Sequence, residues 1–217
     1  MAAADFVEAR LLSLATREGV VFGDLEFTVP RGGLGVITGP SGSGRSALLL
    51  TLAGRMPGWT GALRVGGHDA ARESRAVRRI SAVARIGSMI DLEPRHTVGE
   101  AITERALIDG MSPRAAGQTV HRAARELELR LADDTLVERL PAVDRTILAV
   151  LLATVRPAEL VIIDDVDRGL DAGQQARVWS VLDALTADHT TVLASTVHPE
   201  TVPDAARLIT LDPVPSS

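Results

Sequence analysis

Cysteine, tyrosine and lysine are all missing from this chain of 217 residues, and aromatic residues make up only 2% of it. Without cysteine, the chain can form neither a disulfide framework nor a thiolate metal site. Its 23 basic residues are therefore all arginine, and they are dispersed along the sequence. Nucleic-acid-binding proteins typically gather such residues in a basic stripe. With a net charge of −5, the chain is not expected to bind nucleic acid.

Long apolar runs are also missing. No stretch approaches the roughly 20 apolar residues that a membrane-spanning helix needs. The longest run, residues 147–155, lies between Arg145 and Arg156 and predicts a buried helix. The first ten residues carry acids and lack the basic-then-apolar order of a signal peptide. We expect no direct membrane insertion, so any role at a membrane would depend on a partner protein.

What the chain does have is enough apolar residues, 46%, for a packed core. No internal repeat or low-complexity linker divides it, so residues 1–217 are expected to form one domain. Helical spacing and short apolar runs alternate along the sequence, which predicts an α/β fold with a largely parallel core sheet. The predicted strands are residues 20–29, 34–38, 63–65, 160–163, 191–194 and 207–211, and the predicted helices are 46–53, 98–137 and 174–185.

A glycine-rich run at residues 39–46, GPSGSGRS, matches the phosphate-binding P-loop at every position but one. Glycines let the backbone curl so that successive N–H groups point at phosphate oxygens, and the helix that follows adds its positive end. The alternative is an ordinary Gly/Ser turn between a strand and a helix. The predicted nucleotide-binding residues are Gly39, Ser41, Gly42, Ser43, Gly44, Arg45, Ser46 and Ala47.

Arg45 is the one exception, because the motif has lysine at this position. A guanidinium is planar and prefers bidentate contacts, so the exchange is not conservative. Ser46 is expected to place its hydroxyl on Mg²⁺.

A second group of candidate residues follows the apolar strand at 160–163, which delivers Asp164 and Asp165 at its carboxyl end. Ligands bind at this end of the strands in open α/β sheets. We expect Asp164 to hold Mg²⁺, usually through water, and Asp165 to stand where a base polarises the attacking water. The alternative is a pair of solvated acids at the end of a strand.

Taken in order, these segments resemble the ATP-binding subunit of ABC transporters, from about residue 20 to residue 211. Five further segments resemble parts of the family pattern. They are the hairpin after the first helix at residues 61–69, the segment just past the Gln loop at 93–100, the D-loop at 169–172, the switch-histidine segment at 195–200 and the entry to the closing strand at 204–208. The resemblance implies a P-loop ATPase with a largely parallel core sheet, an antiparallel β subdomain and a small helical subdomain at about residues 88–140. It implies ATP and Mg²⁺ as cofactors and a membrane-spanning permease as partner, and it admits a second ATP-binding cassette.

The resemblance also assigns roles to particular residues. Asp165 takes the position of the family's catalytic glutamate, and His198 resembles the switch histidine; read alone, His198 is a surface residue in a turn. Asp171 lies where the family has its D-loop and also suits a helix cap, two roles that are compatible.

Several positions depart from the family pattern. The family has a glutamine near position 88, where this chain has the shorter Ser88, and Asp165 is one methylene shorter than glutamate. No aromatic residue stands near Thr16 to stack on adenine, since the nearest, Phe22, is expected in the core. The signature loop corresponds to residues 140–145, which lack its serine and glycines and carry Asp144, whose charge would repel a polyphosphate.

We therefore expect the ATP-binding subunit of a membrane ABC transport system that hydrolyses Mg-ATP weakly. It would lie in the cytoplasm at the inner face of the cell membrane, held by a permease that docks near residues 88–111. The alternative is a nucleotide-responsive regulatory or structural subunit without significant turnover. A competent ATPase whose substitutions compensate one another is less favoured. A P-loop kinase is weaker still, because the sequence shows no arginine-bearing lid.

Overall fold

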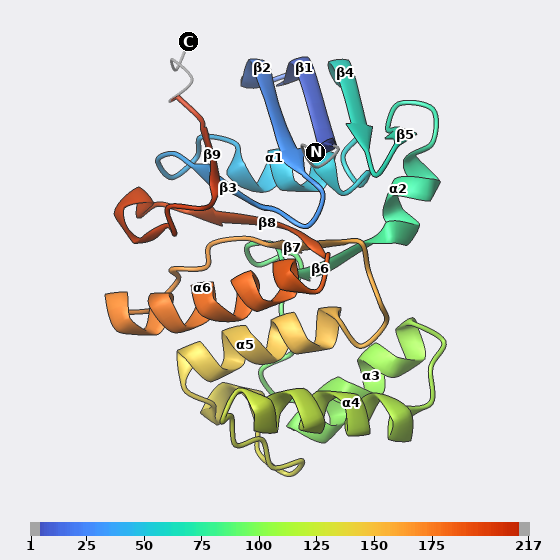
Figure 1. The fold of residues 1–217 in the computed structure, drawn as a ribbon, viewed down its shortest axis with the longest axis vertical. Helices are drawn as coiled ribbons and strands as arrows, with labels where there is room; N and C mark the ends of the chain where they lie inside the picture. The colour runs from blue at the N-terminus through green and yellow to red at the C-terminus, as the bar shows by residue number, and fades with distance from the viewer. Residues whose placement is uncertain (1–4, 213–217) are drawn as a thin grey trace.

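A five-stranded parallel sheet forms the centre of the computed structural model, which describes residues 5–212 (Figure 1). Its strand order is β6-β7-β8-β3-β9, and every neighbouring pair runs parallel. The predicted α/β class with a parallel core sheet is therefore confirmed. The strands are β3 (Leu34–Thr38), β6 (Ser81–Arg85), β7 (Leu160–Ile163), β8 (Thr191–Thr196) and β9 (Arg207–Thr210).

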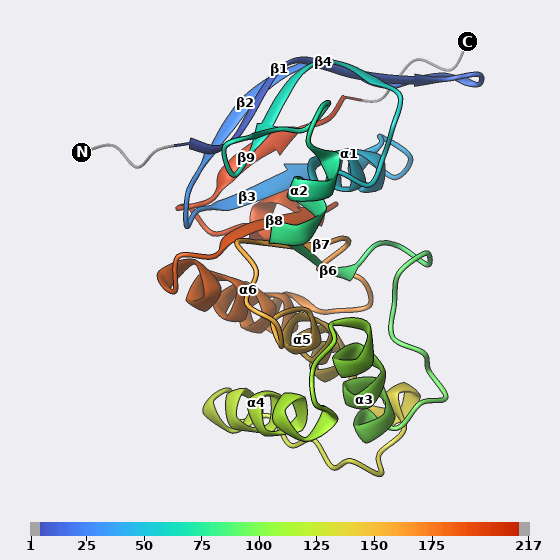
Figure 2. The same cartoon turned by 90° about the vertical axis from the view of Figure 1, so that its right-hand side faces the viewer.

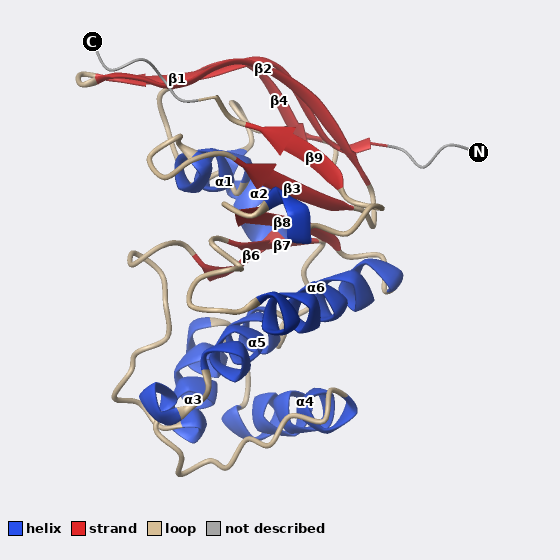
Figure 3. Cartoon of the chain, turned by 90° about the vertical axis from the view of Figure 1, so that its left-hand side faces the viewer, coloured by secondary structure: helices blue, strands red, loops and turns tan. Residues whose placement is uncertain are grey.

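A four-stranded sheet in the order β2-β1-β4-β5 covers one side of this core, as Figure 3 shows, and its pairs are antiparallel. It consists of β1 (Asp5–Thr16), β2 (Gly19–Pro30), β4 (Trp59–Val65) and β5 (His68–Asp69). The strand β1 was not expected from the sequence. Its register shifts repeatedly against β2, and Leu11 has a φ of +48°. These irregularities break the two-residue alternation by which strands are recognised.

Two hydrophobic cores flank the parallel sheet, and neighbouring residues of β7 contribute to different ones. Leu160 and Ile162 pack in the core shared with the antiparallel sheet and α1 (Arg45–Leu52). Ile163 packs in the core shared with α5 (Ala142–Ala153) and α6 (Ala172–Ala187). All four residues of β7 are fully buried. A strand covered on both faces shows no alternation of polar and apolar residues. The uninterrupted apolar sequence of β7 therefore correctly predicted a strand buried on both faces.

The helices α3 (Val98–Ile108) and α4 (Pro113–Glu126) lie on the far side of α5 from the parallel sheet (Figure 2). The predicted helical stretch of residues 98–137 was too long, because the chain turns between Asp109 and Ser112 and leaves the helical conformation again after Leu127. Gly110, with φ +69°, makes the first break. Between α4 and α5 the structure has one short helical turn, η1 (Val137–Arg139).

Two further elements were missed, α2 (Ser74–Ile80) and the edge strand β6, which follows it directly. Their sequence is rich in arginine and alanine, so neither a helical nor a strand period stands out. A short turn at η2 (Pro199–Thr201) precedes β9. Within residues 5–212, no helix is both long and apolar enough to cross a bilayer. The expected lack of a signal peptide rests partly on residues 1–4, outside the described range.

Candidate functional site

The predicted phosphate loop connects β3 to α1 at the carboxyl end of the parallel sheet. Gly39, Gly42 and Gly44 all have positive φ values, +153°, +81° and +91°. A Cβ atom at Gly39 would lie 2.6 Å from the Leu211 carbonyl oxygen, and one at Gly44 would lie 2.8 Å from the Val21 carbonyl oxygen. The positive φ favours glycine at all three positions, and the close contacts at Gly39 and Gly44 leave no room there for a side chain.

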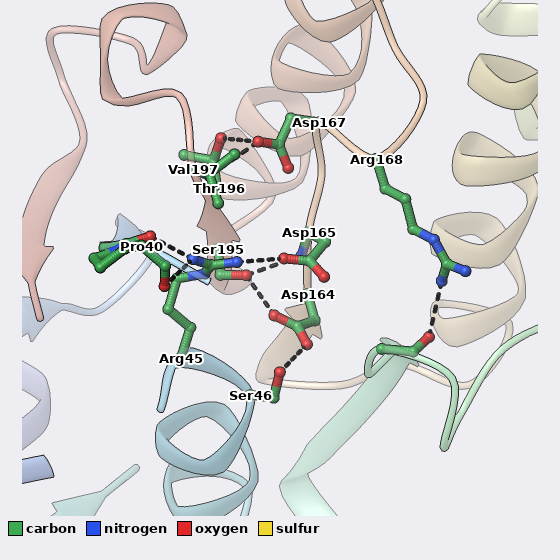
Figure 4. A network of polar contacts seen from close by, with 12 residues as sticks. Pro40, Arg45, Ser46, Asp164, Asp165, Asp167, Arg168, Ser195, Thr196 and Val197 are labelled. Atoms are coloured by element: carbon green, nitrogen blue, oxygen red, sulfur yellow. Dashed lines mark hydrogen bonds and ion pairs between the residues drawn. The ribbon is translucent and has the colours of Figure 1, made fainter. Parts of the chain in front are cut away.

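The side chain of Arg45 folds back over this loop (Figure 4). Its Nη1 donates hydrogen bonds to the carbonyl oxygens of Gly39 and Pro40, the latter at 2.9 Å. Its Nη2 forms an ion pair with Asp165 Oδ1 at 2.8 Å. The Arg45 side chain is only 10% exposed, and its buried Nε has no hydrogen-bond partner among the described residues. The residue predicted to contact phosphate thus contacts the predicted base.

Ser46 and Asp164, the two predicted metal ligands, lie side by side. The Ser46 hydroxyl donates to Asp164 Oδ2 at 2.5 Å, and the Asp164 residue is fully buried. A hydroxyl and a carboxylate oxygen are ligands that Mg²⁺ accepts together with phosphate oxygens and water. In the part of the chain that the structure describes, no cluster of three or more histidine or acidic residues could hold a metal. Mg²⁺ held by this pair would take its remaining ligands from phosphate oxygens and water.

Ser195, which sequence analysis missed, holds both acids in place from the neighbouring strand β8. Its buried hydroxyl donates to Asp164 Oδ1 and accepts a 2.8 Å hydrogen bond from the Asp165 N–H. The parallel pairing of β7 with β8 brings Ser195 to this position. Because that pairing joins residues some thirty positions apart, no local pattern in the sequence could have shown it.

Arg85, at the end of β6, is the second residue that sequence analysis missed. Its guanidinium donates to the carbonyl oxygens of Asp164 and Asp165 at 3.2 and 2.5 Å, and to Thr146 Oγ1 at 3.1 Å. Burial lowers the pKa of Arg85 from its ordinary value, since a desolvated cation is disfavoured. Ser88, where the family resemblance implied a glutamine, lies exposed in the turn that follows. From this segment, Arg85 is thus the side chain that contacts the two acidic residues.

The acidic turn after β7 is also fastened to its surroundings. Asp167 accepts hydrogen bonds from Thr196 Oγ1 and the Val197 N–H, both at 2.9 Å. Arg168 donates to the Gly87 carbonyl oxygen at 3.1 Å. The turn is therefore tied to the end of β8 on one side and to the loop after β6 on the other (Figure 4).

His198 lies in the loop after β8, and its side chain is half exposed. The contact recorded for its ring is a 3.0 Å hydrogen bond from Nδ1 to Glu200 Oε1. The structure does not bring this ring into hydrogen-bond contact with Asp165, Arg45 or the other predicted site residues that it describes. Its assigned catalytic role remains a prediction.

The segment at residues 140–145 forms the start of α5, with Pro141 at the N-cap and no side-chain cap. Asp144 was expected to confront a polyphosphate, but its carboxylate is 3.3 Å from Arg177 of α6. The ion pair offsets part of the repulsion that its charge alone suggested. Asp171 caps α6 through a reciprocal capping box with Gln174, so the predicted cap is confirmed.

A cavity of about 300 Å³ adjoins the phosphate loop. Residues 42–47 form one wall, and Leu50, Met56 and Met89 form an apolar wall. Phe22 is 3% exposed and packs in the core, as predicted, so it is not available for stacking on a nucleobase. Among the described residues that line this cavity, none is aromatic.

Comparison with known proteins agrees with this geometry. Residues 22–167 match the family model described as ABC transporter. The Nod factor export ATP-binding protein I of Bradyrhizobium diazoefficiens is 29% identical over 82% of this chain and 57% of its own length. The daunorubicin/doxorubicin resistance ATP-binding protein DrrA of Streptomyces peucetius is 29% identical over 80% of this chain and 52% of its own length. The chain thus spans little more than half the length of these relatives.

Solved structures share the fold at low sequence identity. A bacterial ABC transporter cassette solved as a dimer superposes with a TM-score of 0.79 at 17% identity, covering 95% of this chain and 94% of that one. CbiO1 of Clostridium perfringens, described as part of the transporter complex CbiONQ, gives a TM-score of 0.75 at 15% identity, covering 95% and 84%. The family match, together with the phosphate loop and the paired acids, shows that this chain belongs to the ABC transporter family of ATP-binding domains.

Proposed function

We propose that this chain is the ATP-binding subunit of a membrane ABC transport system and that it binds Mg-ATP and hydrolyses it slowly. The observation that carries the proposal is the position of Ser46 and Asp164, whose oxygens lie 2.5 Å apart where the glycine loop opens into α1. A phosphate chain in the loop would meet the N–H groups of residues 42–47. Bound Mg²⁺ would supply positive charge between the phosphate oxygens and these two ligands.

The placement of Arg45 and Asp165 supports slow hydrolysis. A phosphoryl transition state needs its charge neutralised and its attacking water positioned. Arg45 can neutralise phosphate charge only by leaving Asp165. The side chains of Arg45 and Asp165 are 10% and 30% exposed, and breaking their ion pair offsets part of the interaction energy between Arg45 and phosphate. Asp165 is also one methylene shorter than the family's glutamate, and a displacement of about 1 Å can lower a rate roughly 100-fold.

A regulatory or structural subunit without significant turnover is the second candidate, and the segment at residues 140–145 favours it. Pro141, Ala142 and Val143 stand where the family has serine and glycines. In the family this loop clasps the ATP of the facing subunit. Asp144 keeps a negative charge there, although Arg177 offsets part of it. Compensating substitutions that restore a competent ATPase are a third possibility, which the turnover measurement below separates from the other two.

The partner we propose is a membrane-spanning permease, with a second ATP-binding cassette as a further partner. The support is a set of exposed apolar side chains within the docking segment expected at residues 88–111. Met89 and Leu107 are each 67% exposed, Ile108 is 72% exposed and Ile90 is 36% exposed. Exposed apolar side chains such as these can be buried against a partner protein. The permease would hold the chain at the cytoplasmic face of the membrane.

Residues 1–217 would act as one domain, with residues 88–140 as its helical subdomain.

The test is a paired measurement of ATP binding and steady-state hydrolysis on the pure chain. Calorimetry with a non-hydrolysable ATP analogue and Mg²⁺ should show binding of modest affinity, because no aromatic residue stacks on the base. No binding heat at millimolar ligand would refute the nucleotide site. Detectable but slow turnover supports the ATP-hydrolysing subunit, and binding with no turnover supports the regulatory one. Rapid turnover would point to the compensated enzyme.

A further inference from the structure

Arg85 is a buried arginine that contacts the two acidic residues of the site, and it is not among the site residues predicted from the sequence. It ends β6 at the edge of the parallel sheet and is 5% exposed. Its three hydrogen bonds reach the carbonyl oxygens of two consecutive residues, Asp164 and Asp165, and the hydroxyl of Thr146, which is 1% exposed. A planar fork of donors is suited to holding neighbouring acceptors in one geometry.

These bonds are made at an energetic disadvantage. Among the described residues, no carboxylate lies within 4 Å of the Arg85 guanidinium, and burial lowers its pKa. The carboxylates of Asp91, Asp165 and Asp164 act favourably on this charge from beyond that distance. A buried charge without a direct carboxylate partner is nevertheless costly. The charge-assisted hydrogen bonds to the two carbonyl groups are the interactions that offset this cost.

The residue that receives the shortest of these bonds has an uncommon backbone conformation. Asp165 has a φ of +47°, in the left-handed region that residues other than glycine rarely occupy. Such a conformation persists only where the surroundings determine it. The Asp165 N–H donates to Ser195 Oγ and its carbonyl oxygen accepts from Arg85, so both of its peptide groups are fixed. In this conformation its carboxylate reaches Arg45.

We propose that Arg85 is a positioning residue, which holds Asp165 in the left-handed conformation and so points its carboxylate at Arg45 and the phosphate loop. In the right-handed conformation, the Cα–Cβ bond of Asp165 would leave the backbone in another direction, away from this contact. An effect of Arg85 on hydrolysis rests on the proposed function, but its effect on the conformation of Asp165 does not. We therefore expect the Arg45–Asp165 interaction to exist only while Arg85 is present.

The experiment is a double-mutant cycle on the full chain, followed by urea unfolding without nucleotide. Arg45→Met, Asp165→Asn and their combination give the coupling between the two side chains. The cycle is then repeated in the Arg85→Met background, which removes the fork but keeps a side chain of similar length. Arg55→Met is the matched control background, because Arg55 is also partly buried and donates to a backbone carbonyl, that of Ala53 at 3.1 Å.

The expected result is a clear coupling in the unaltered and Arg55→Met backgrounds and loss of that coupling in the Arg85→Met background. Equal coupling in all backgrounds would overturn the proposal. A lower overall stability of Arg85→Met would not rescue it, because loss of a purely structural arginine would also lower stability. If Arg85→Met does not fold, Arg85→Lys takes its place. The lysine keeps the charge but has one ammonium group instead of a fork, so undiminished coupling there would equally overturn the proposal.

A second readout separates this proposal from the proposed function. If the chain hydrolyses ATP, Arg85→Met should lower the rate in the Asp165 chain and leave the residual rate of the Asp165→Asn chain unchanged. A loss of the same factor in both chains would show that Arg85 does not act through Asp165. A chain without turnover would contradict the hydrolytic function only, and the unfolding cycle would still decide the role of Arg85.

Discussion

Arg45 and Asp165 form an ion pair at 2.8 Å, although one is predicted to contact phosphate and the other to act on water. The two residues lie 120 positions apart in the chain, and the contact depends on the phosphate loop and the end of β7 meeting at one edge of the sheet. Under the proposed function, nucleotide binding and this ion pair would therefore compete for the same guanidinium.

The first prediction concerns turnover. Hydrolysis by the unaltered chain should be at least about tenfold below an enzyme median near 10 per second. Replacing Arg45→Lys and Asp165→Glu together should raise the rate, because a lysine acts as a point charge on phosphate and the longer acid reaches the attacking water. Phosphate release under saturating Mg-ATP measures both rates.

The matched control for this prediction is Arg31→Lys. Arg31 pairs with Glu159 at the same distance of 2.8 Å but at the opposite ends of the strands, so its exchange should not change the rate. Rapid hydrolysis by the unaltered chain, abolished by Asp165→Asn, would contradict the predicted impairment and favour the compensated enzyme.

The second prediction concerns the metal. Ser46→Ala removes one of the two predicted Mg²⁺ ligands and leaves the backbone of the loop unchanged. It should weaken ATP binding in the presence of Mg²⁺ by about tenfold or more, and weaken it much less in EDTA. Calorimetry under both conditions gives the comparison, with the EDTA measurement as the internal control. Equal losses in both conditions would show that the hydroxyl contacts the nucleotide itself and not the metal.

The third prediction concerns assembly. In the family two cassettes face each other, and each ATP is closed by the other's signature loop. Residues 140–145 lack the serine and glycines of that loop, so closure of two identical chains on ATP should gain little differential affinity. We expect the sedimentation coefficient of the pure chain to be the same with and without Mg-ATP. A dimer that forms only with ATP would mean that residues 140–145 do clasp nucleotide.

The fourth prediction concerns pH and the start of α3. Glu100 forms a capping box with Thr97, and its hydrogen bond from the Thr97 N–H lowers the pKa of Glu100 below its ordinary value of 4.5. A carboxylate with a lowered pKa stabilises the folded state above its unfolded pKa, and this stabilisation is lost as the pH falls through the folded value. Glu100→Ala should therefore lower the melting temperature at pH 7 and lower it less at pH 3. A difference that is equal at both pH values would show that the charge contributes nothing.

Several parts of the site were predictable because they are local. The glycine spacing of residues 39–46 indicates a backbone curl wherever it occurs between a strand and a helix, since only glycine accepts these φ values. The uninterrupted apolar run before Asp164 likewise indicates a strand buried on both faces, which ends at the ligand-binding edge of the sheet. The capping function of Asp171 is local too, because its partner is three residues away.

What the sequence alone determined is thus the family, the α/β class, the phosphate loop and the identity of the paired acids, all of which are encoded in short segments. The tertiary structure decided which side chains surround those acids. Ser195 comes from β8, Arg85 from the unpredicted edge strand β6 and Arg45 from the phosphate loop, and only the parallel pairing of the strands brings them together. Such contacts depend on strand order and backbone conformation, and no periodicity within a segment records either of them.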